Sequence, residues 1–259
     1  MDKVAEVDPV DVSISVVSHH QLELIKRLLD DLEKHCGDSR FELILTLNLD
    51  ESLPFALERF SYPIKLVRNP VPKGFGANHN QAFQQSSGTY FCVMNPDVRL
   101  NSDPFSTLLE CLRNGGVAMV APLVLAKDGA VEDSARRFPQ PLKLLCKLFG
   151  ACRHPDYRIG KSLIFPDWVG GMFMLFPRDI YALLGGFDER YFLYYEDVDL
   201  CARLRLLGRE IALNPQAQVI HDAQRNSHRS LRYLRWHLRS MARFFLSPVY
   251  WQLRRLSRS

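Results

Sequence analysis

Two groups of acidic residues stand where they could do chemistry. Asn95-Pro96-Asp97 directly follows an apolar run, and Glu196, Asp197 and Asp199 place three carboxylates within four residues at the start of another. A carboxylate such as Asp97 can hold Mg²⁺ or Mn²⁺ against a diphosphate, because both cations take oxygen ligands and share substrate phosphates. Three close carboxylates repel one another, which raises the pKa of at least one and favours a proton acceptor. The sequence therefore offers a cation site and a general base.

Each group also has a structural interpretation that the residues alone leave open. Asn, Pro and Asp favour turns, so residues 95–97 could simply end a strand. Acidic residues at the start of a helix are favoured by capping and by the helix dipole, although capping needs only one of the three. His221, which precedes Asp222, is more typical of a structural histidine than of a ligand when taken alone. The loop 73–78 lacks both the G-x-G-x-x-G and the P-loop pattern, so it resembles a phosphate-binding loop only weakly.

The elements that must position these residues follow from periodicity. Alternating or continuous apolar runs predict strands, and apolar residues at helical spacing predict the helices between them. This alternation indicates a parallel sheet, and ligands of such sheets bind beyond the carboxyl ends of the strands, where Asn95-Pro96-Asp97 lies. The expected strands are 12–17, 41–47, 64–67, 89–94 and 117–121, the last completing the core of the sheet. The expected helices are 21–34, a short one after Pro54, one that follows the Gly-rich turn 73–76 and runs to about residue 85, and 103–113.

The second half of the chain begins with weak periodicity. Residues 127–166 are rich in Pro, Arg and Lys, which predicts a loop-rich, substrate-facing segment with a helix near 142–149. Order returns with a strand at 168–176, a helix at 178–184, a helix at 196–207 stopped by Gly208, and a short strand at 218–220. The aromatic run 191–195 could wall a sugar pocket or belong to the core.

Composition places the chain among ordinary one-domain α/β proteins. It has 259 residues, 47% of them hydrophobic and 24% charged. The acidic start does not resemble a secretion signal, and no apolar stretch approaches the roughly 20 residues that cross a bilayer. Six cysteines without a C-x-x-C pair predict reduced, buried thiols and a cytoplasmic location.

The basic charge is concentrated at the C-terminus. Nine arginines and no acidic residue follow Asp222, which predicts a specific anionic partner. Within 229–245 the arginines recur every three or four residues, with Leu231, Leu234, Leu238, Met241 and Phe245 on the opposite face. This basic amphipathic helix could pack on the core or attach to an anionic membrane surface or a lipid diphosphate. No helix-turn-helix, zinc or RNA-binding signature supports a nucleic-acid partner.

In combination, seven ordered motifs resemble the family-two inverting glycosyltransferases of GT-A fold. The resemblance covers about residues 10 to 245, and within the family it points most to bacterial O-antigen rhamnosyltransferases through three further segments. The seven motifs are Val16-Val17-Ser18-His19, Gly74-Phe75-Gly76-Ala77-Asn78-His79-Asn80, Asn95-Pro96-Asp97, Asp167-Trp168-Val169-Gly170-Gly171, Gly185-Gly186-Phe187-Asp188-Glu189, Tyr195-Glu196-Asp197-Val198-Asp199-Leu200 and His221. The three further segments are Val17-Ser18-His19, Ser134-Ala135-Arg136-Arg137-Phe138-Pro139 and Trp236-His237-Leu238-Arg239-Ser240.

The resemblance implies a role for each matching residue. Asp97 resembles the metal-holding aspartate of the family's D-x-D motif, with Asn95 in place of the first Asp, and His221 resembles the histidine that completes the metal site. Asp197 resembles the catalytic base and Glu196 its acceptor-contacting neighbour. The nucleotide-sugar donor is expected on Ser18, His19, Asn48, Gly74, Phe75, Asn78, Asn95 and Asp97. The acceptor is expected on Trp168, Gly170, Gly171 and Glu196.

One position departs from the family pattern. Relatives often have Asp-Asn at the end of the second strand, where this chain has Leu47-Asn48, so an aspartate that reads the nucleobase is missing.

The expected activity is metal-dependent inverting sugar transfer in O-antigen or cell-surface polysaccharide synthesis. The resemblance implies L-rhamnose from dTDP-L-rhamnose, a lipid-diphosphate-linked saccharide as acceptor and Mg²⁺ or Mn²⁺ as cofactor. The basic helix adds the expectation of peripheral attachment at the inner face of the cytoplasmic membrane. The expected organisation is an α/β catalytic domain, 1–222, with a Rossmann-like, mostly parallel sheet, and a basic helical extension, 223–259. A nucleotidyltransferase and a catalytically silent sugar-binding homologue are the alternatives.

Overall fold

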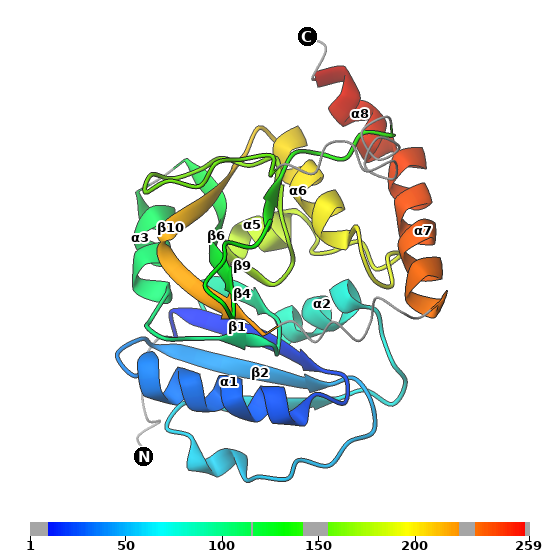
Figure 1. Ribbon diagram of the computed structural model, residues 1–259. Coiled ribbons are helices and arrows are strands. Elements are labelled where there is room, and N and C mark those ends of the chain that lie inside the picture. The colour runs from blue at the N-terminus through cyan, green and yellow to red at the C-terminus, as the bar shows by residue number, and fades with distance from the viewer. Residues whose placement is uncertain (1–9, 115, 142–154, 223–230, 257–259) are drawn as a thin grey trace, which may run out of the picture.

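A mostly parallel eight-stranded sheet organises the chain in a computed structural model, which describes residues 10–114, 116–141, 155–222 and 231–256 (Figure 1). The strand order is β3-β2-β1-β4-β9-β6-β10-β5, with β7 and β8 paired separately. The strands are β1 (Val12–Ser18), β2 (Phe41–Leu47), β3 (Ile64–Arg68), β4 (Tyr90–Met94), β5 (Val98–Arg99), β6 (Val117–Ala126), β7 (Ala135–Arg136), β8 (Trp168–Val169), β9 (Phe173–Pro177) and β10 (Glu210–His221).

Helices cover both faces of this sheet. They are α1 (Leu22–His35), the 3-10 helix η1 (Leu57–Arg59), α2 (Phe75–Gln85), α3 (Phe105–Arg113), α5 (Arg178–Leu183), α6 (Glu196–Leu206), α7 (Leu231–Leu246) and α8 (Pro248–Leu256). The arrangement confirms the predicted mostly parallel sheet flanked by helices. None of the helices in the described ranges is long and apolar enough to cross a membrane.

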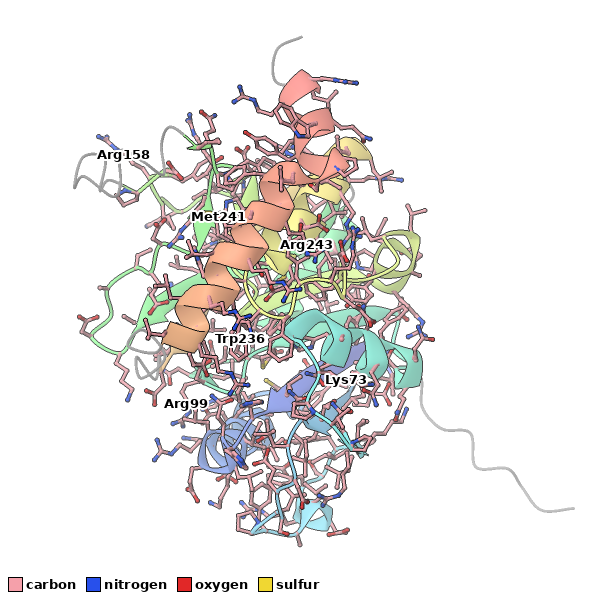
Figure 2. All side chains as sticks on the ribbon, turned by 90° about the vertical axis from the view of Figure 1, so that its right-hand side faces the viewer. Lys73, Arg99, Arg158, Trp236, Met241 and Arg243 are labelled. Carbon is pink, nitrogen blue, oxygen red and sulfur yellow. The ribbon has the colours of Figure 1, made fainter. Side chains whose placement is uncertain are left out.

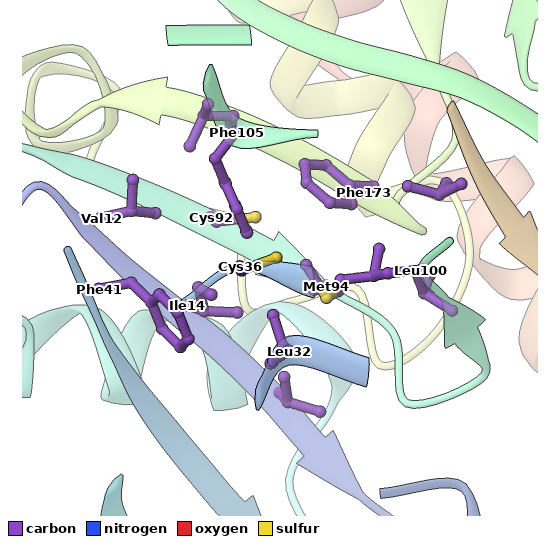
Figure 3. Close-up of a cluster of buried hydrophobic side chains, with 14 of the residues drawn as sticks. Val12, Ile14, Leu32, Cys36, Phe41, Cys92, Met94, Leu100, Phe105 and Phe173 are labelled. Carbon is purple, nitrogen blue, oxygen red and sulfur yellow. The ribbon is translucent and has the colours of Figure 1, made fainter. Parts of the chain in front are cut away.

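Side-chain alternation along the strands builds a core on each face. Cys92 and Met94 of β4 point to the face covered by α1 and α3, whereas Phe91 and Val93 point to the face covered by α2, α5 and α6. Because successive side chains of a strand point to opposite faces, one buried strand serves both cores. Figure 3 shows part of the first core, with Phe105 of α3 near Cys92 and Phe173. This double burial holds the carboxyl ends of the strands in fixed positions.

Three predictions about the sheet are wrong. The sheet is not complete at residue 121, because β9 inserts antiparallel between β4 and β6 and β10 extends the sheet beyond β6. The strand predicted at 168–176 is two strands, since residues 170–172 form a turn between β8 and β9. The strand predicted at 218–220 is the end of the twelve-residue β10, whose pairing with β6 has a register shift between Asn214 and Gln218.

Most of the remaining predicted elements lie within one or two residues of their predicted bounds where they are described, but β6 runs to Ala126 instead of ending at residue 121, and the short helix predicted after Pro54 is the 3-10 helix η1. Helix α6 ends as predicted just before Gly208, whose φ of +68° favours glycine. The helix predicted at 142–149 lies outside the described residues. Cys36, Cys92, Cys111 and Cys201 are free and buried, as predicted for reduced thiols, while Cys146 and Cys152 are not described.

The C-terminal helices pack beside α6. Phe244 of α7 and Tyr250 of α8 form a third buried cluster with residues of α6 and the segment before it. These residues are Tyr191, Tyr195, Val198 and Ala202. Figure 2 shows α7 crossing this face of the molecule, with Trp236 in its N-terminal half. Helix α7 therefore lies directly over the aromatic segment 191–195 that leads into α6.

Candidate functional site

Asp97 and His221 meet because β5 pairs with the end of β10. In that antiparallel pair Val98 lies opposite His221, and the backbone N–H of Asp222 donates to the carbonyl of Asp97 over 2.8 Å. The Nε2 atom of His221 lies 3.3 Å from Oδ2 of Asp97. Two residues 124 positions apart in the chain are thus held side by side at the edge of the sheet where β4 ends.

Glu132 completes a line of three side chains. Its Oε2 lies 2.8 Å from Nδ1 of His221, on the side of the ring opposite Asp97. Burial alone would lower the pKa of His221, but the hydrogen bonds and charges of Asp97 and Glu132 outweigh it and raise that pKa to about 9. Sequence reasoning missed Glu132. The Asp128-Gly129 pair, a hairpin signal four residues earlier, could have indicated that the chain folds back here.

The Asp97–His221 pair fits a divalent cation. The second carboxylate oxygen of Asp97, Oδ1, is buried without a hydrogen-bond partner among the described residues, and buried polar atoms in proteins normally have one. Adjacent ligands of an octahedral ion with bonds of about 2.1 Å lie about 3 Å apart, close to the 3.3 Å between Asp97 Oδ2 and His221 Nε2. Within the described ranges, no three His, Cys, Asp or Glu side chains are grouped to hold a metal by themselves. Diphosphate oxygens would complete such a shell.

Asp197 is oriented by backbone N–H groups. Its Oδ2 accepts from Gly171 over 3.1 Å and its Oδ1 from Val198 over 2.8 Å. Burial raises its pKa, although these backbone hydrogen bonds favour the charged form. A carboxylate that is fixed in direction and more basic than usual suits proton abstraction.

Glu196 and Asp199 differ from Asp197 in their surroundings. Burial, with the neighbouring charge of Asp197, raises the pKa of Glu196 to about 8, and its Oε2 is buried with no hydrogen-bond partner in the described part of the chain. Asp199 is 2% exposed and forms an ion pair with Arg203, whose Nε lies 2.8 Å from Oδ2. Arg203 also donates to the carbonyls of Leu184 and Gly186. Asp199 therefore has a structural role. The sequence alone did not distinguish this role from those of Glu196 and Asp197.

The turn 170–172 joins the two acidic groups. Its Gly171 N–H donates to Asp197, while its Met172 carbonyl accepts from the backbone N–H of Asn95 over 2.9 Å. A Cβ on Gly171 would stand 3.3 Å from the ring of Phe75, which leaves little room for a side chain. The structure thus brings together residues 95–97, 170–172 and 196–197, and it places Phe75, the first residue of α2, against Gly171.

The loop before α2 is fastened to the aromatic segment. The N–H of Phe75 donates to the carbonyl of Phe192 over 2.9 Å, and a Cβ on Gly74 would come within 2.8 Å of the same oxygen. Glycine is required at this close approach. Asn78 is 1% exposed and binds the carbonyl of Gly74, so it shapes this loop from inside.

Both polar atoms of the Asn48 side chain also form hydrogen bonds within the protein. Its Nδ2 donates to the carbonyl of Lys73, and its Oδ1 accepts from Lys73 N–H and from Asn69. Ser18 is fully buried and accepts from Gln21 N–H. Of the predicted donor residues at the ends of β1 and β2, His19 is the exposed one.

Trp168 is partly buried at the predicted acceptor side. Its indole N–H donates to the carbonyl of Arg137 over 3.0 Å, and Arg136 stacks on the ring. Gly170 N–H donates to the carbonyl of Ser134. The rhamnosyltransferase-like segment 134–139 therefore lines the same side of the molecule as Trp168.

Glu196→Gln is expected to flatten the dependence of stability on pH. Since the pKa of Glu196 is raised, its contribution to stability is full below its ordinary value near 4.5 and is lost as pH rises through about 8. The glutamine variant should thus gain thermal stability relative to the parent protein at pH 9 but not at pH 5. Melting temperatures across this range measure the effect. Parallel curves for the two proteins would contradict a buried, ionising Glu196.

The family of this chain follows from a match between its sequence and a family model. A family model described as glycosyl transferase family 2 matches residues 13–176, well over half of the chain. The chain belongs to glycosyl transferase family 2. Family membership decides between two of the activities that the sequence left open. This family 2 protein is a glycosyltransferase and not a nucleotidyltransferase.

Curated relatives of this glycosyltransferase include rhamnosyltransferases. It is 29% identical over 248 residues to rhamnosyltransferase WbbL of Escherichia coli K12, which covers 90% of this chain and 92% of that protein. It is 31% identical over 182 residues to N-acetylglucosaminyl-diphospho-decaprenol L-rhamnosyltransferase of Mycobacterium tuberculosis H37Rv, covering 62% of this chain and 59% of that protein. These names agree with the resemblance to bacterial rhamnosyltransferases.

Solved structures share the GT-A fold of this glycosyltransferase. GalNAc-T7 with UDP, GalNAc and Mn²⁺ matches with a TM-score of 0.64 and 14% identity over 91% of this chain and 48% of that chain. The mannosyltransferase PcManGT from Pyrobaculum calidifontis, in complex with GDP-Man and Mn²⁺, matches with a TM-score of 0.60 and 16% identity over 96% of this chain and 74% of that chain. At these identities the likeness shows the fold alone.

Proposed function

We propose that this glycosyltransferase moves L-rhamnose from dTDP-L-rhamnose to a lipid-diphosphate-linked saccharide, inverting the anomeric carbon. The observation that carries the proposal is the turn 170–172, which binds both Asn95 and Asp197 and so holds a candidate diphosphate site beside a candidate base. The sugar comes from the relatives named as rhamnosyltransferases. The lipid diphosphate comes from the mycobacterial relative, whose name contains diphospho-decaprenol.

On the donor side, Asp97 and His221 would hold a divalent cation. Both solved neighbours are complexes that contain Mn²⁺ together with UDP or GDP-Man. The buried Oδ1 of Asp97, which has no hydrogen-bond partner among the described residues, supports the same use here. The cation would stabilise the negative charge that grows on the leaving diphosphate. Asn95 is neutral and would contact the nucleotide sugar without binding metal.

On the acceptor side, Asp197 would accept the proton of the attacking hydroxyl. Gly171 and Val198 fix its carboxylate by hydrogen bonds, so it is already oriented when the acceptor arrives. Glu196 lies beside it and would donate a hydrogen bond to the acceptor when protonated. A single displacement inverts the sugar and needs no covalent sugar-enzyme intermediate.

The predicted binding residues have two roles in this proposal: some would contact a substrate, and the others would shape the surface that binds it. His19 and Phe75 would touch the donor, whereas the buried Ser18, Asn48, Gly74 and Asn78 would shape the surface on which it lies. Trp168, with Gly170 and Gly171, would bound the acceptor saccharide.

A donor panel tests the proposed substrate. Thermal shift with dTDP-, UDP- and GDP-sugars, each with Mg²⁺ or Mn²⁺, measures binding because a ligand of the folded state raises stability by RT ln(1 + [L]/Kd). We expect the largest shift with dTDP-rhamnose and a divalent cation. A preference for UDP-sugars would overturn the rhamnose assignment. Binding without transfer to any lipid-diphosphate saccharide would favour the catalytically silent homologue.

We further propose that the extension 223–259 attaches the enzyme to anionic lipid at the inner face of the cytoplasmic membrane. Within α7, Leu231, Leu234 and Leu238 are 84%, 53% and 50% exposed, so these leucines do not pack on the core. Arg235 and Arg239 are exposed beside them. An apolar stripe flanked by arginines suits the interface of an anionic bilayer, where each basic residue contributes about 1 kcal/mol.

The face of α7 that does pack supports the same orientation. Trp236 lies against Phe192, with ring centroids 4.8 Å apart, and Ser240 donates to the carbonyl of Leu193 over 2.8 Å. The helix is thereby fixed to segment 191–195, which leads directly to Glu196 and Asp197. A lipid surface bound to the leucines would lie close to the site that a lipid-linked acceptor must reach.

Replacing Leu234 and Leu238 together by Glu is expected to weaken vesicle binding at least about tenfold. Two half-exposed leucines contribute on the order of 1.5–3 kcal/mol on burial, and the new charges repel anionic lipid. Co-sedimentation with phosphatidylcholine vesicles, with and without phosphatidylglycerol, measures the effect. Leu183→Glu is the matched control, since Leu183 on α5 is 62% exposed.

Two outcomes would contradict the attachment. One is parental binding that does not depend on salt or phosphatidylglycerol. The other is a stable dimer that the double variant converts to a monomer, which would show that a second copy covers the leucines.

A further inference from the structure

Glu132 lies on the side of the His221 imidazole that faces away from Asp97. Its side chain, 23% exposed, contacts Nδ1 of His221, while the opposite ring atom, Nε2, faces Asp97. The three residues come from three separate parts of the chain: the segment after β6, the end of β10, and the turn after β4. The side chains therefore form a line of carboxylate, imidazole and carboxylate, with Glu132 at its outer end.

The hairpin after β6 fixes the position of Glu132. Ala126 N–H donates to the carbonyl of Ala130 over 2.8 Å, and Glu132 N–H donates to the carbonyl of Val124 over 2.9 Å. Ala126 in turn lies opposite His221 in the parallel pairing of β6 with β10. Backbone hydrogen bonds on both strands therefore set the distance from Glu132 to the imidazole.

The protonation state of the imidazole decides whether it can bind a cation. A ligating imidazole must present a lone pair, and its remaining proton then sits on the other nitrogen. A carboxylate beside Nδ1 keeps one proton there, so that the proton a cation displaces is the one on Nε2, and it makes the ring a better donor of electrons. Without such a partner, the tautomer with the proton on Nε2 would compete and could not ligate.

We propose that Glu132 is a positioning residue that holds His221 in its metal-binding tautomer by accepting the Nδ1–H hydrogen bond. The inference rests on the proposed metal role of Asp97 and His221 and adds to it a residue from outside all of the seven motifs. Glu132 touches neither the donor nor the acceptor in this account; it acts only through the imidazole.

Mn²⁺ binding tests this role without any assay of turnover. Electron paramagnetic resonance of free Mn²⁺ gives its affinity for the full chain, with Mn²⁺ alone and with Mn²⁺ plus dTDP. Glu132→Ala should weaken Mn²⁺ binding about 10–100-fold, as loss of outer partners of ligating histidines does in other proteins. Glu132→Gln should lose less, because its amide oxygen still accepts from Nδ1–H.

Two measurements separate positioning from a structural tie between the hairpin and β10. Asp133→Asn is the matched control, since it removes the adjacent carboxylate, which pairs with Arg136 and not with His221, and it should bind Mn²⁺ like the parent. In ¹⁵N-histidine spectra with Mg²⁺, the His221 proton should lie on Nδ1 in the parent and in Glu132→Gln, and lose that preference in Glu132→Ala.

The outcomes distinguish this inference from the proposed function. If His221→Ala and Asp97→Asn abolish Mn²⁺ binding but Glu132→Ala stays within about twofold of the parent, against the 10–100-fold loss expected, the positioning role is wrong and the metal site stands. Equal weakening by Asp133→Asn would also overturn it. Mn²⁺ binding that survives His221→Ala would overturn both the metal site and the inference.

Discussion

Asp197→Asn is expected to lower turnover about 10²–10⁴-fold, the range typical of losing a general base, while leaving the affinity for the donor unchanged. The amide oxygen of asparagine can still accept from Gly171 N–H, so the local backbone should remain in place. What the variant loses is the ability to take the acceptor's proton. Steady-state transfer, together with donor titration monitored by thermal shift, measures the two quantities separately.

Asp199→Asn is the control for this prediction. Asp199 differs from Asp197 by two positions but is buried against Arg203. Removing one partner of a buried ion pair destabilises a protein, so we expect a lower melting temperature and near-parental turnover per folded molecule. Near-parental turnover in Asp197→Asn, with folding intact, would contradict the assignment of the base.

Asp97→Asn is expected to lose the cation-dependent part of donor binding and catalysis. Lewis-acid stabilisation of a leaving group is worth several kcal/mol, so turnover should fall by about 10³-fold. The variant should also behave alike with Mn²⁺ and with EDTA, because the remaining ligand, His221, cannot hold the ion alone. Donor titrations with and without Mn²⁺ measure this difference. Restoration of parental turnover by excess Mn²⁺ would contradict the role of Asp97.

The two variants should lose activity in different ways, and that difference tests whether Asp197 acts on the acceptor and Asp97 on the donor. Asp197→Asn should bind donor and not transfer it, whereas Asp97→Asn should lose cation-dependent binding as well. Identical losses of binding in both would indicate a shared structural defect.

The first half of the fold was predictable from the sequence because its elements are local. The strand 41–47 and the helix 21–34 are each visible as one uninterrupted pattern, and parallel pairing follows from their alternation. The sheet order beyond β4 was not predictable in this way. Strand β9 pairs antiparallel with β4 across about eighty residues of chain, and nothing in the sequence of 173–177 encodes that partner.

The candidate site was predictable as a set of residues and not as a set of contacts. Asp97, Asp197 and His221 were named as candidates from ordered motifs, yet the turn 170–172 that joins two of these regions appears only in three dimensions. Glu132 was missed for the same reason, since its importance comes from the hairpin that brings it to His221.

Segment 191–195 and helix α7 show how tertiary contacts overrule periodicity. The sequence left open whether the aromatic run walls a pocket or fills the core. Tyr191 and Tyr195 are buried, whereas Phe192 is 36% exposed and stacks on Trp236. In α7 the sequence also left open whether the apolar face packs on the core: Leu231, Leu234 and Leu238 are exposed, whereas Met241 and Phe245 pack against the third buried cluster.

The anomeric configuration of the product tests the central claim most directly. In the proposed single displacement, the carboxylate of Asp197 would act as the base for the acceptor, and Asp97 with His221 would lie at the leaving diphosphate. Nuclear magnetic resonance of the glycoside formed from dTDP-rhamnose and a lipid-diphosphate saccharide should show the configuration opposite to that of the donor, with formation prevented by EDTA. A product that retains the donor's configuration would contradict the mechanism.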